Sequence, residues 1–266
     1  MIWAVQSDQF AIARNLRCAM GAYARSTGKG AALDLGAAGA FSSGVDYGVF
    51  NALVLSDCVS SSRLAALLDE GAAFYRACGV AWSCWLDEAM VDSAGGPEAA
   101  RRLESHGLRW IAEHEGMVAE PLRPHRRGGL PVVDAQPVSD EQTREDFVHV
   151  CSKVFLLPET ITRLIYGDAP FWNGAMRGWV GYDGGRPVCT AVSAADHTSV
   201  GLYSVATMLS HRRRGYGEAI TRHAFGEAAA RSGLNRSILQ STPAGLKLYR
   251  RMGYRACTRI TVWTSE

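Results

Sequence analysis

The chain lacks the features that mark several classes of protein. Its seven cysteines are scattered and include no C-x-x-C pair, so neither a disulfide framework nor a zinc site is expected. No apolar run reaches the length of a membrane span, and the first residues lack the basic and apolar segments of a secretory signal. These absences predict a cytoplasmic protein with no membrane partner and no metal.

Charge of either sign is not in excess. The sequence has 28 lysine and arginine residues and 26 aspartate and glutamate residues, a formal net charge of +2, which does not suggest a nucleic-acid partner. The basic run at 123–129 stands between patterned segments, and we interpret it as a solvated linker. With 266 residues, of which 47% are hydrophobic, the chain is long enough for two small domains with proper cores.

A strand, a glycine-containing turn and a helix follow one another in the second half. After the strand-like run at 200–209 come Arg212, Arg213, Arg214, Gly215, Tyr216 and Gly217, and then a helical pattern at 218–231. The first turn of a helix leaves backbone N–H groups unpaired and carries partial positive charge, and glycine lets the backbone approach an anion closely. The pattern predicts a pyrophosphate site; the alternative is a solvated arginine-rich loop.

Two other nucleotide-binding patterns do not fit this turn. A G-x-G-x-x-G fingerprint would need a third glycine at position 220, where Ile220 stands. The Gly-Lys-Ser/Thr sequence of a Walker loop occurs nowhere in the chain. Neither kind of nucleotide fold is therefore expected.

A second motif follows the helix and an apolar strand at 237–241. It consists of Thr242, Gly245, Leu248, Tyr249, Gly253 and Tyr254. Together with Arg212, Gly215 and Gly217, these residues resemble the two acetyl-CoA motifs of the GNAT superfamily of N-acetyltransferases, in the family's order and spacing. The resemblance covers roughly residues 131–266.

The first half repeats the order of elements of the second half. It shows strands at 49–56, 80–86 and 108–120, with helices at 60–78 and 97–106 that end at Gly79 and Gly107. The second half shows strands at 200–209, 237–241 and 254–264, with helices at 218–232 and 243–252. We interpret this as a degenerate internal repeat. It predicts an α/β fold of two tandem GNAT copies, each a mixed, mostly antiparallel sheet flanked by helices: a domain at 1–124, a linker at 125–130 and a catalytic domain at 131–266.

The first copy lacks the residues that would bind a coenzyme. The loop before its first helix, 57–62, contains neither glycine nor arginine, and Leu103 stands where the second copy has Tyr249. This copy is therefore not expected to bind coenzyme A. Two roles remain open for it: to cover or shape the active site, or to serve as a structural or dimerising domain.

The resemblance implies acetyl-CoA as the cofactor and assigns its contacts. Backbone amides of the turn would hold the pyrophosphate, and the pantetheine arm would lie along the strand before it. An amide near Val205 or Ala206 would donate to the thioester oxygen, an interaction worth about 3 kcal/mol. The implied contacts are Val205, Ala206, Thr207, Met208, Arg212, Arg213, Arg214, Gly215, Tyr216, Gly217, Glu218, Thr242, Gly245 and Tyr249.

By the same resemblance, Tyr249 is the candidate acid that protonates the departing thiolate; the alternative is a tyrosine packed on its helix. An alkylamine with a pKa of about 10 is mostly protonated at neutral pH, so a base or a water relay is also needed. The glutamate that many members carry on this strand is absent from 201–207. Tyr203, acting through water, and the pair Asp196 and His197 remain as candidates, although Asp-His is also typical of a turn.

The acceptor pocket is expected from the first helices of the second copy. The sequence predicts a helix at 140–150 capped by Ser139, a second helix beginning at 156–159 and an aromatic loop at 166–172. In that loop Tyr166, Phe171 and Trp172 suggest a planar or apolar acceptor, with Glu159 and Asp168 as partners for an ammonium group. The alternative for each of these residues is an ordinary core or surface position.

The sequence as a whole predicts an acetyl-CoA-dependent N-acetyltransferase that acts on a small-molecule amine. Three alternatives remain: a catalytically silent protein that binds or senses acyl-CoA, an acetyltransferase that acts on a protein amine, and a two-domain interaction scaffold that binds no cofactor.

Overall fold

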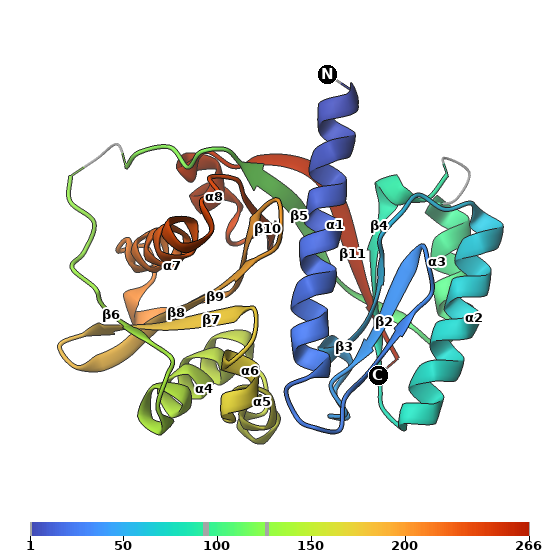
Figure 1. The fold of residues 1–266 in the computed structure, drawn as a ribbon, viewed down its shortest axis with the longest axis horizontal. Helices are drawn as coiled ribbons and strands as arrows, with labels where there is room; N and C mark the ends of the chain where they lie inside the picture. Colours follow the sequence, from blue (N-terminus) through green and yellow to red (C-terminus); the bar gives the residue numbers. More distant parts are fainter. Residues whose placement is uncertain (1, 93–95, 126–127, 266) are drawn as a thin grey trace. The chain divides into compact units, whose positions relative to one another are not determined.

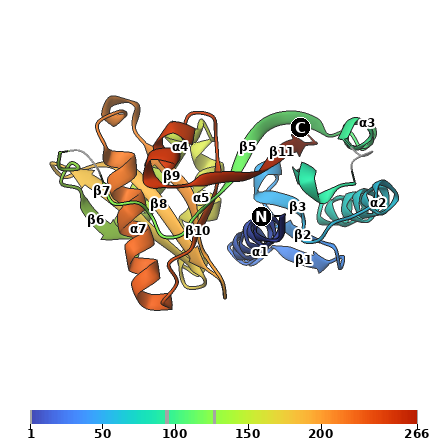
Figure 2. The ribbon, with the colours of Figure 1, turned by 90° about the horizontal axis from the view of Figure 1, so that it is seen from above.

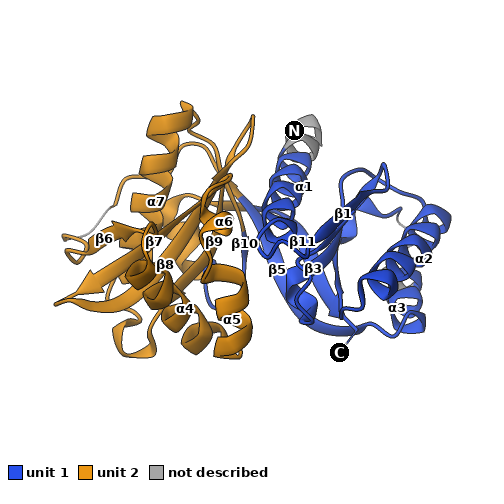
Figure 3. Ribbon diagram, turned by 60° about the horizontal axis from the view of Figure 1, so that its bottom comes forward, with its two compact units in different colours: residues 1–117, 240–246, 256–266 blue, residues 118–239, 247–255 orange. Residues whose placement is uncertain are grey.

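The computed structural model describes residues 2–92, 96–125 and 128–265. The chain forms two compact units, which Figure 3 distinguishes by colour. The first comprises 1–117, 240–246 and 256–266, and the second comprises 118–239 and 247–255.

The first unit is a sheet with helices on both faces (Figures 1 and 2). Its strands are β1 (Ala31–Asp34), β2 (Ala38–Ser42), β3 (Asn51–Leu55), β4 (Ser83–Asp87), β5 (Arg109–Ala119) and β11 (Arg255–Thr264), in the order β1-β2-β3-β4-β11-β5. Its helices are α1 (Ile2–Ala24), α2 (Ser61–Cys78) and α3 (Gly96–Ser105). β3 and β4 run parallel, whereas β11 runs antiparallel to β4.

Alternating residues of these strands build two apolar layers. Leu53 packs against Gly71 of α2, and Gly39, on the opposite face of the sheet, faces Arg17 of α1. Figure 2 accordingly shows α1 and α2 on opposite sides of β2. Because successive side chains of a strand point to opposite faces, a sheet covered by helices on both sides needs apolar residues at nearly every position. All five residues of β3 are buried.

The second unit is also a sheet between helices (Figure 1). Its strands are β6 (Asp134–Pro137), β7 (Met176–Asp183), β8 (Arg186–Ala195), β9 (Val200–Thr207) and β10 (Ser237–Ser241), in the order β10-β9-β8-β7-β6. Its helices are α4 (Glu141–Phe155), α5 (Glu159–Tyr166), α6 (Ala169–Trp172), α7 (Tyr216–Ser232) and α8 (Leu246–Met252). β9 and β10 run parallel, as β3 and β4 do. The mixed α/β architecture expected from the sequence is confirmed.

The helix ends read from the sequence in the first unit are confirmed. The hydroxyl of Ser60 accepts a hydrogen bond from the backbone N–H of Arg63 at 3.2 Å, and Gly79 ends α2 in the left-handed conformation with a φ of 67°. Gly107 follows α3 with a φ of 77°.

The cap expected for the first helix of the second copy is wrong by one residue. The N-cap of α4 is Asp140, not Ser139, because the Asp140 carboxylate accepts the Thr143 backbone N–H at 2.8 Å while the Thr143 hydroxyl faces the Asp140 backbone N–H. This is a reciprocal capping box. The helix also continues to Phe155, beyond the predicted end at 150.

The segment expected as an aromatic loop contains helix. α5 begins at Glu159, after Leu156 has ended α4 with a φ of 56°, and includes Tyr166. Phe171 and Trp172 lie in the short helix α6. The aromatic side chains of this segment are therefore held on turns of helix.

The expected boundary of the second domain needs one correction. β11 pairs with β4 of the first unit, in a register from Ile260 opposite Asp87 to Thr264 opposite Ser83. Residues 256–266 therefore belong to the first unit. Their buried residues Ile260 and Val262 are 1–2% exposed, and this apolar burial favours the pairing.

No helix in the described ranges is long and apolar enough to span a membrane. The same ranges contain no group of three or more histidine, cysteine, aspartate or glutamate residues that could hold a metal ion.

Candidate active site

β9 is distorted in its middle by a bulge. Ala206 pairs with Thr190 of β8 and Tyr203 pairs with Val192, so Ser204 and Val205 stand opposite a single residue. Ser204 has a φ of 47°, and its carbonyl accepts a hydrogen bond from the Thr190 hydroxyl at 2.9 Å. A bulge of this kind bends the strand and removes residues from the ladder. The Val205 backbone is thereby taken out of the regular pairing with β8.

The other edge of β9 is paired over a short distance. The parallel register with β10 comprises Val200 opposite Ser237 and Gly201 opposite Ile238. Within the described part of the second unit, no residue of β9 beyond Gly201 has a partner in β10. Unpaired strand edges present backbone donors and acceptors to a ligand.

The turn between β9 and α7 has the geometry of an anion site. Arg213 has a φ of 60° and Gly215 a φ of 94°, and α7 begins directly afterwards at Tyr216. No side chain caps the N-terminus of α7. The first-turn N–H groups of this 17-residue helix are therefore available, and successive amides in a turn of this type form a concavity for an anion.

The close approach of neighbouring atoms explains why positions 215 and 217 are occupied by glycine. A Cβ at Gly215 would lie 2.8 Å from Cδ of Pro131, and its positive φ disfavours other residues. A Cβ at Gly217 would lie 3.1 Å from Oγ1 of Thr207 and 3.6 Å from Cδ2 of Leu248. The second contact brings α8, which carries Tyr249, to the start of α7, so the two sequence motifs meet in space.

The side chains of the turn are held in different ways. Arg212 donates from Nε to the Thr207 carbonyl at 3.2 Å, and Arg213 and Arg214 are exposed. Tyr216 is buried and donates its hydroxyl to Asp183 at 2.6 Å. Arg213 and Arg214 are thus free of burial at the turn, while Tyr216 contributes its backbone N–H.

Glu218 is a buried carboxylate in the first turn of α7. It accepts hydrogen bonds from Nδ1 of His125 at 2.8 Å and from Nε of Arg222 at 2.9 Å. Burial alone would raise its pKa, but these two bonds outweigh it and hold the pKa below the ordinary value. Its side chain is therefore engaged within the protein.

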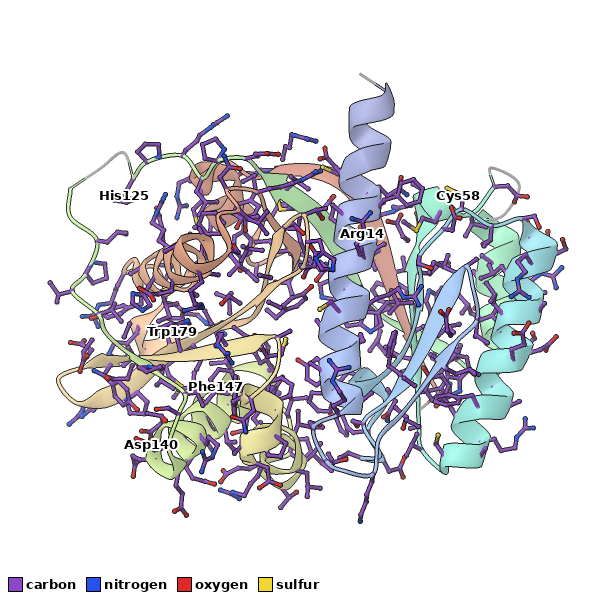
Figure 4. All side chains as sticks on the ribbon, in the orientation of Figure 1. Arg14, Cys58, His125, Asp140, Phe147 and Trp179 are labelled. Atoms are coloured by element: carbon purple, nitrogen blue, oxygen red, sulfur yellow. The ribbon has the colours of Figure 1, made fainter. Side chains whose placement is uncertain are left out.

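Two residues that support the turn were not found from the sequence. Asp183 reads as part of a β-hairpin turn, and it does precede the Gly184–Gly185 turn, but its carboxylate also anchors Tyr216 and lies 3.6 Å from Nε2 of His211. His125, which is labelled in Figure 4, reads as part of a solvated linker, yet it binds Glu218. The described residues of the basic run are exposed, as expected of a solvated linker, and His125 in addition binds Glu218. No local pattern could have signalled either pairing, because the partners are 33 and 93 residues away.

Tyr249 lies on α8 and is buried, 8% exposed. Its ring packs edge-on against Tyr254, with centroids 5.6 Å apart. Burial raises the pKa of Tyr249 well above its ordinary value, so the phenol keeps its proton at neutral pH. Among the described residues, its hydroxyl has no hydrogen-bond partner, whereas the Tyr254 hydroxyl lies 2.6 Å from Oγ of Ser237.

Thr242 and Gly245 form the turn that leads into α8, and the Gly245 N–H donates to the Thr242 carbonyl at 3.0 Å.

Directly after β9, Met208 donates its backbone N–H to the Val188 carbonyl at 2.9 Å. The Met208 amide is therefore already paired, and Val205 is the residue of the expected pantetheine segment that the bulge sets apart.

The aromatic residues expected to line the acceptor pocket form a core cluster. Phe147 of α4 packs with Tyr166 and Trp172, and Phe171 packs edge-on against Trp172, with centroid distances of 4.7–5.1 Å. Phe171 is 1% exposed and Trp172 is 5% exposed. Only Tyr166 extends a polar group toward β9: its hydroxyl lies 3.3 Å from Oγ of Ser204. Tyr203, beside Ser204, is half-buried.

Asp196 and His197 form the turn between β8 and β9. The Asp196 carboxylate accepts the backbone N–H groups of Thr198 at 2.7 Å and Ser199 at 2.8 Å, and His197 is exposed. They lie at the opposite end of the eight-residue strand β9 from Thr207, roughly 25 Å along the strand. The geometry does not bring them to the turn at 212–217.

The corresponding helix start in the first unit is arranged differently. The backbone N–H and hydroxyl of Ser61, at the start of α2, donate to the two carboxylate oxygens of Asp92 at 3.3 and 2.7 Å. The Ser60 hydroxyl accepts a hydrogen bond from another backbone N–H of the first turn, that of Arg63. A carboxylate and a hydroxyl of the protein thus occupy the amides that a phosphate would need.

Comparisons with known proteins agree with this geometry. Residues 175–256 match the model described as "Acetyltransferase (GNAT) domain", and no curated protein matches the chain. Among solved structures, a GCN5-related N-acetyltransferase from Kribbella flavida aligns with a TM-score of 0.69 and 20% identity, over 96% of this chain and 94% of its own. Another, from Sphaerobacter thermophilus, has a TM-score of 0.56 and 16% identity over 87% and 81%.

A third structure, described as a tandem GNAT protein from the clavulanic acid biosynthesis pathway, aligns with a TM-score of 0.53 and 10% identity over 75% and 68%. Residues 175–256 therefore match the GNAT acetyltransferase domain, and the chain has the fold of the GNAT N-acetyltransferases. The order β3, α2, β4, α3, β5 followed by β9, α7, β10, α8, β11 fits a tandem arrangement.

Proposed function

We propose that the chain is an acetyl-CoA-dependent N-acetyltransferase that acts on the amine of a small molecule. The observation that carries this proposal is the start of α7. It has no side-chain cap, follows a turn with two positive-φ residues and three exposed arginines, and lies beside the helix of Tyr249. A pyrophosphate is the ligand that this combination of amides and guanidinium groups would bind best.

The residues present fit the donor along its length. The N–H groups at the start of α7 would hold the pyrophosphate, with Arg212, Arg213 and Arg214 adding charge. The edge of β9 that faces β10, which has no partner in β10 beyond Gly201, would pair with the peptide-like pantetheine arm. When bound, acetyl-CoA supplies an activated acetyl thioester.

Three groups of the chain would then serve the transfer. The Val205 or Ala206 backbone N–H would donate to the thioester oxygen and stabilise the charge that develops there. Tyr203, with Ser204 and Tyr166 beside it, would orient the acceptor amine and pass its proton to water. Tyr249, which burial keeps protonated, would give a proton to the departing sulfur.

The acceptor is proposed to be a small molecule. The structural neighbour described as belonging to the clavulanic acid biosynthesis pathway supports this choice by analogy, because clavulanic acid is a small molecule. A panel of small amines and of peptides, assayed for release of the thiol, tests it. Robust turnover of peptides alone would replace it with a protein acceptor.

A catalytically silent acyl-CoA-binding protein is the second candidate. It is favoured by the absence of a carboxylate from 201–207. Binding of acetyl-CoA without turnover of any amine in the panel would decide for it.

Donor binding is tested by thermal unfolding with and without acetyl-CoA. We expect a rise of the midpoint that grows with ligand concentration and is lost in Gly215→Glu/Gly217→Glu, which places side chains and negative charge in the turn. Gly226→Glu is the matched control, because Gly226 lies on α7 with open space around its Cα. No rise in the wild-type protein at millimolar acetyl-CoA would refute the enzyme proposal.

A further inference from the structure

A small cavity lies beside the last turns of α7, in the second unit. Its volume is about 230 Å³, and the residues that matter for its chemistry are Arg177 of β7, Ser193 of β8 and Arg231 of α7. Small residues, among them Gly174, Ala195 and Ala228, complete the wall. α7 has 17 residues, so its two ends lie roughly 25 Å apart. The cavity is thus distinct from the turn at 212–217.

The sheet register brings two of these residues together. Arg177 and Ser193 are direct partners in the antiparallel pairing of β7 and β8, so their side chains project from the same face. Trp179, which is labelled in Figure 4, lies two residues further along β7 and packs edge-on against His223 of α7, with centroids 4.4 Å apart. Since residues two apart on a strand share a face, Arg177 and Ser193 belong to the face that α7 covers.

Ser193 is the residue that points to a ligand. It is 1% exposed, and its hydroxyl has no hydrogen-bond partner in the described part of the chain. Other buried hydroxyls of this sheet are satisfied, since Thr190 donates to the Ser204 carbonyl and Ser237 to the Val200 carbonyl. A buried hydroxyl without a partner is unfavourable, and Ser193 is one of the residues that line the cavity.

Two arginines line the cavity, and Arg177 has no carboxylate partner among the described residues. Arg177 donates from Nη1 to the carbonyls of Trp172 at 2.7 Å and Gly174 at 3.2 Å. These bonds fix the plane of its guanidinium group and leave the N–H groups on Nε and Nη2 without a protein partner among the described residues. Arg231 is half-exposed and lies 3.7 Å from Glu227. No acidic side chain is among the residues that line the cavity.

We propose that this cavity binds a small oxyanion, a carboxylate or a phosphate, held by Ser193, Arg177 and Arg231. Guanidinium groups match the planar fork of a carboxylate and the oxygens of a phosphate, and the serine hydroxyl donates the third hydrogen bond. The helix dipole disfavours an anion at the C-terminal end of α7, and the two arginines offset this. The volume is below the range of about 300–1,000 Å³ usual for drug-sized ligands, which restricts the ligand to a few heavy atoms beyond the anionic group.

Nuclear magnetic resonance titration of the full chain tests the proposal, with inorganic phosphate and malonate as probes at constant ionic strength. We expect saturable amide shifts at Arg177, Ser193 and Arg231 with a Kd of about a millimolar. Saturation by phosphate alone would identify a phosphate ligand, and by malonate alone a carboxylate. Shifts confined to Arg213–Gly217 would show that the anion binds only the turn, and would overturn the proposal.

Two variants and a control localise the binding further. Ser193→Ala and Arg231→Ala should each weaken binding roughly tenfold, as the loss of one charge-assisted or buried hydrogen bond implies. Arg76→Ala should leave it unchanged, because Arg76 lies in the last turn of α2, as Arg231 does in that of α7. Equal affinity in the wild-type protein and both variants, or no saturable binding of either probe, would overturn the proposal and indicate that the cavity holds only water.

Discussion

At the scale of single residues, Tyr249 on α8 and Tyr254, which follows this helix, have different roles. Tyr249 has no hydrogen-bond partner for its hydroxyl in the described chain, whereas the Tyr254 hydroxyl is engaged by Ser237. We expect Tyr249→Phe to leave the unfolding free energy unchanged and to lower kcat by about 100-fold, as removal of a general acid does. We expect Tyr254→Phe to keep kcat and to lose about 1 kcal/mol of stability. Steady-state kinetics and urea unfolding of both variants separate the roles; equal kcat in wild type and Tyr249→Phe would remove Tyr249 from the reaction.

Two half-buried histidines predict how stability depends on pH. Burial lowers the pKa of His114, stacked on Trp85 in the first unit, and of His223, packed on Trp179 in the second. Near and below the unfolded pKa of about 6.5, the unfolded chain binds more protons than the folded one, so the unfolding free energy falls as the pH falls through this range. Above this range both histidines are neutral in both states, and their contribution is constant.

The measurement is urea unfolding between pH 7.5 and pH 5.5. His223→Phe should reduce the decrease of the unfolding free energy between pH 7.5 and pH 5.5, because Phe keeps a ring against Trp179 and does not titrate. Asp87 acts in the opposite direction at lower pH, since burial raises its pKa and its ionised form is the unfavourable one. An unchanged slope in His223→Phe would show that this histidine is not responsible.

At the scale of elements, the support of the turn by a neighbouring hairpin is testable. Asp183, at the end of β7, accepts the hydroxyl of Tyr216, the first residue of α7. Asp183→Ala releases this anchor, and we expect the KM for acetyl-CoA to rise roughly tenfold with little change in kcat, the pattern for an interaction that acts on binding alone. Asp146→Ala is the matched control, because Asp146 accepts the Tyr182 hydroxyl at 2.7 Å on α4. An equal rise of KM in both variants would indicate a general loss of stability instead.

The elements with local signals could be predicted from the sequence, and those that depend on distant partners could not. Ser60, Gly79 and Gly107 mark helix ends through bonds and φ angles within a few residues, so α2 and α3 were found nearly in full. The turn at 212–217 was found for the same reason. The Ser139 error is small, because Ser139 and Asp140 are both good caps and only the Thr143 contact selects between them.

The remaining site residues depend on packing across the sheet. The bulge at Ser204 arises from its register with β8, and the burial of Phe171 and Trp172 arises from Phe147 on α4. An aromatic-rich segment predicts apolar surroundings, but not whether those surroundings are a pocket or a core. Asp183 and His125 were missed because a hairpin turn and a basic linker look the same whether or not they bind a distant helix.

At the scale of the whole molecule, the placement of β11 decides which fragments can fold. The sequence predicts a boundary near residue 124, yet the first unit contains 256–266 as a strand paired with β4. In its absence β4 keeps β3 but loses its antiparallel partner from Ser83 to Asp87, and the apolar residues that pack on Ile260 and Val262 become exposed. We therefore expect residues 1–124 alone to unfold at a much lower urea concentration than the same fragment with 255–266 appended through a glycine-rich linker.

Circular dichroism and urea unfolding of the two fragments measure this difference. A control with 255–266 appended in which Ile260 and Val262 are replaced by Asp should behave like the bare fragment, because charged residues at buried strand positions prevent the pairing. Equal stability of all three fragments would mean that the first unit is complete without β11. The expected result would instead mean that the strand most distant in sequence holds the first unit together, so that the two halves of the repeat fold as one chain and cannot be separated at the linker.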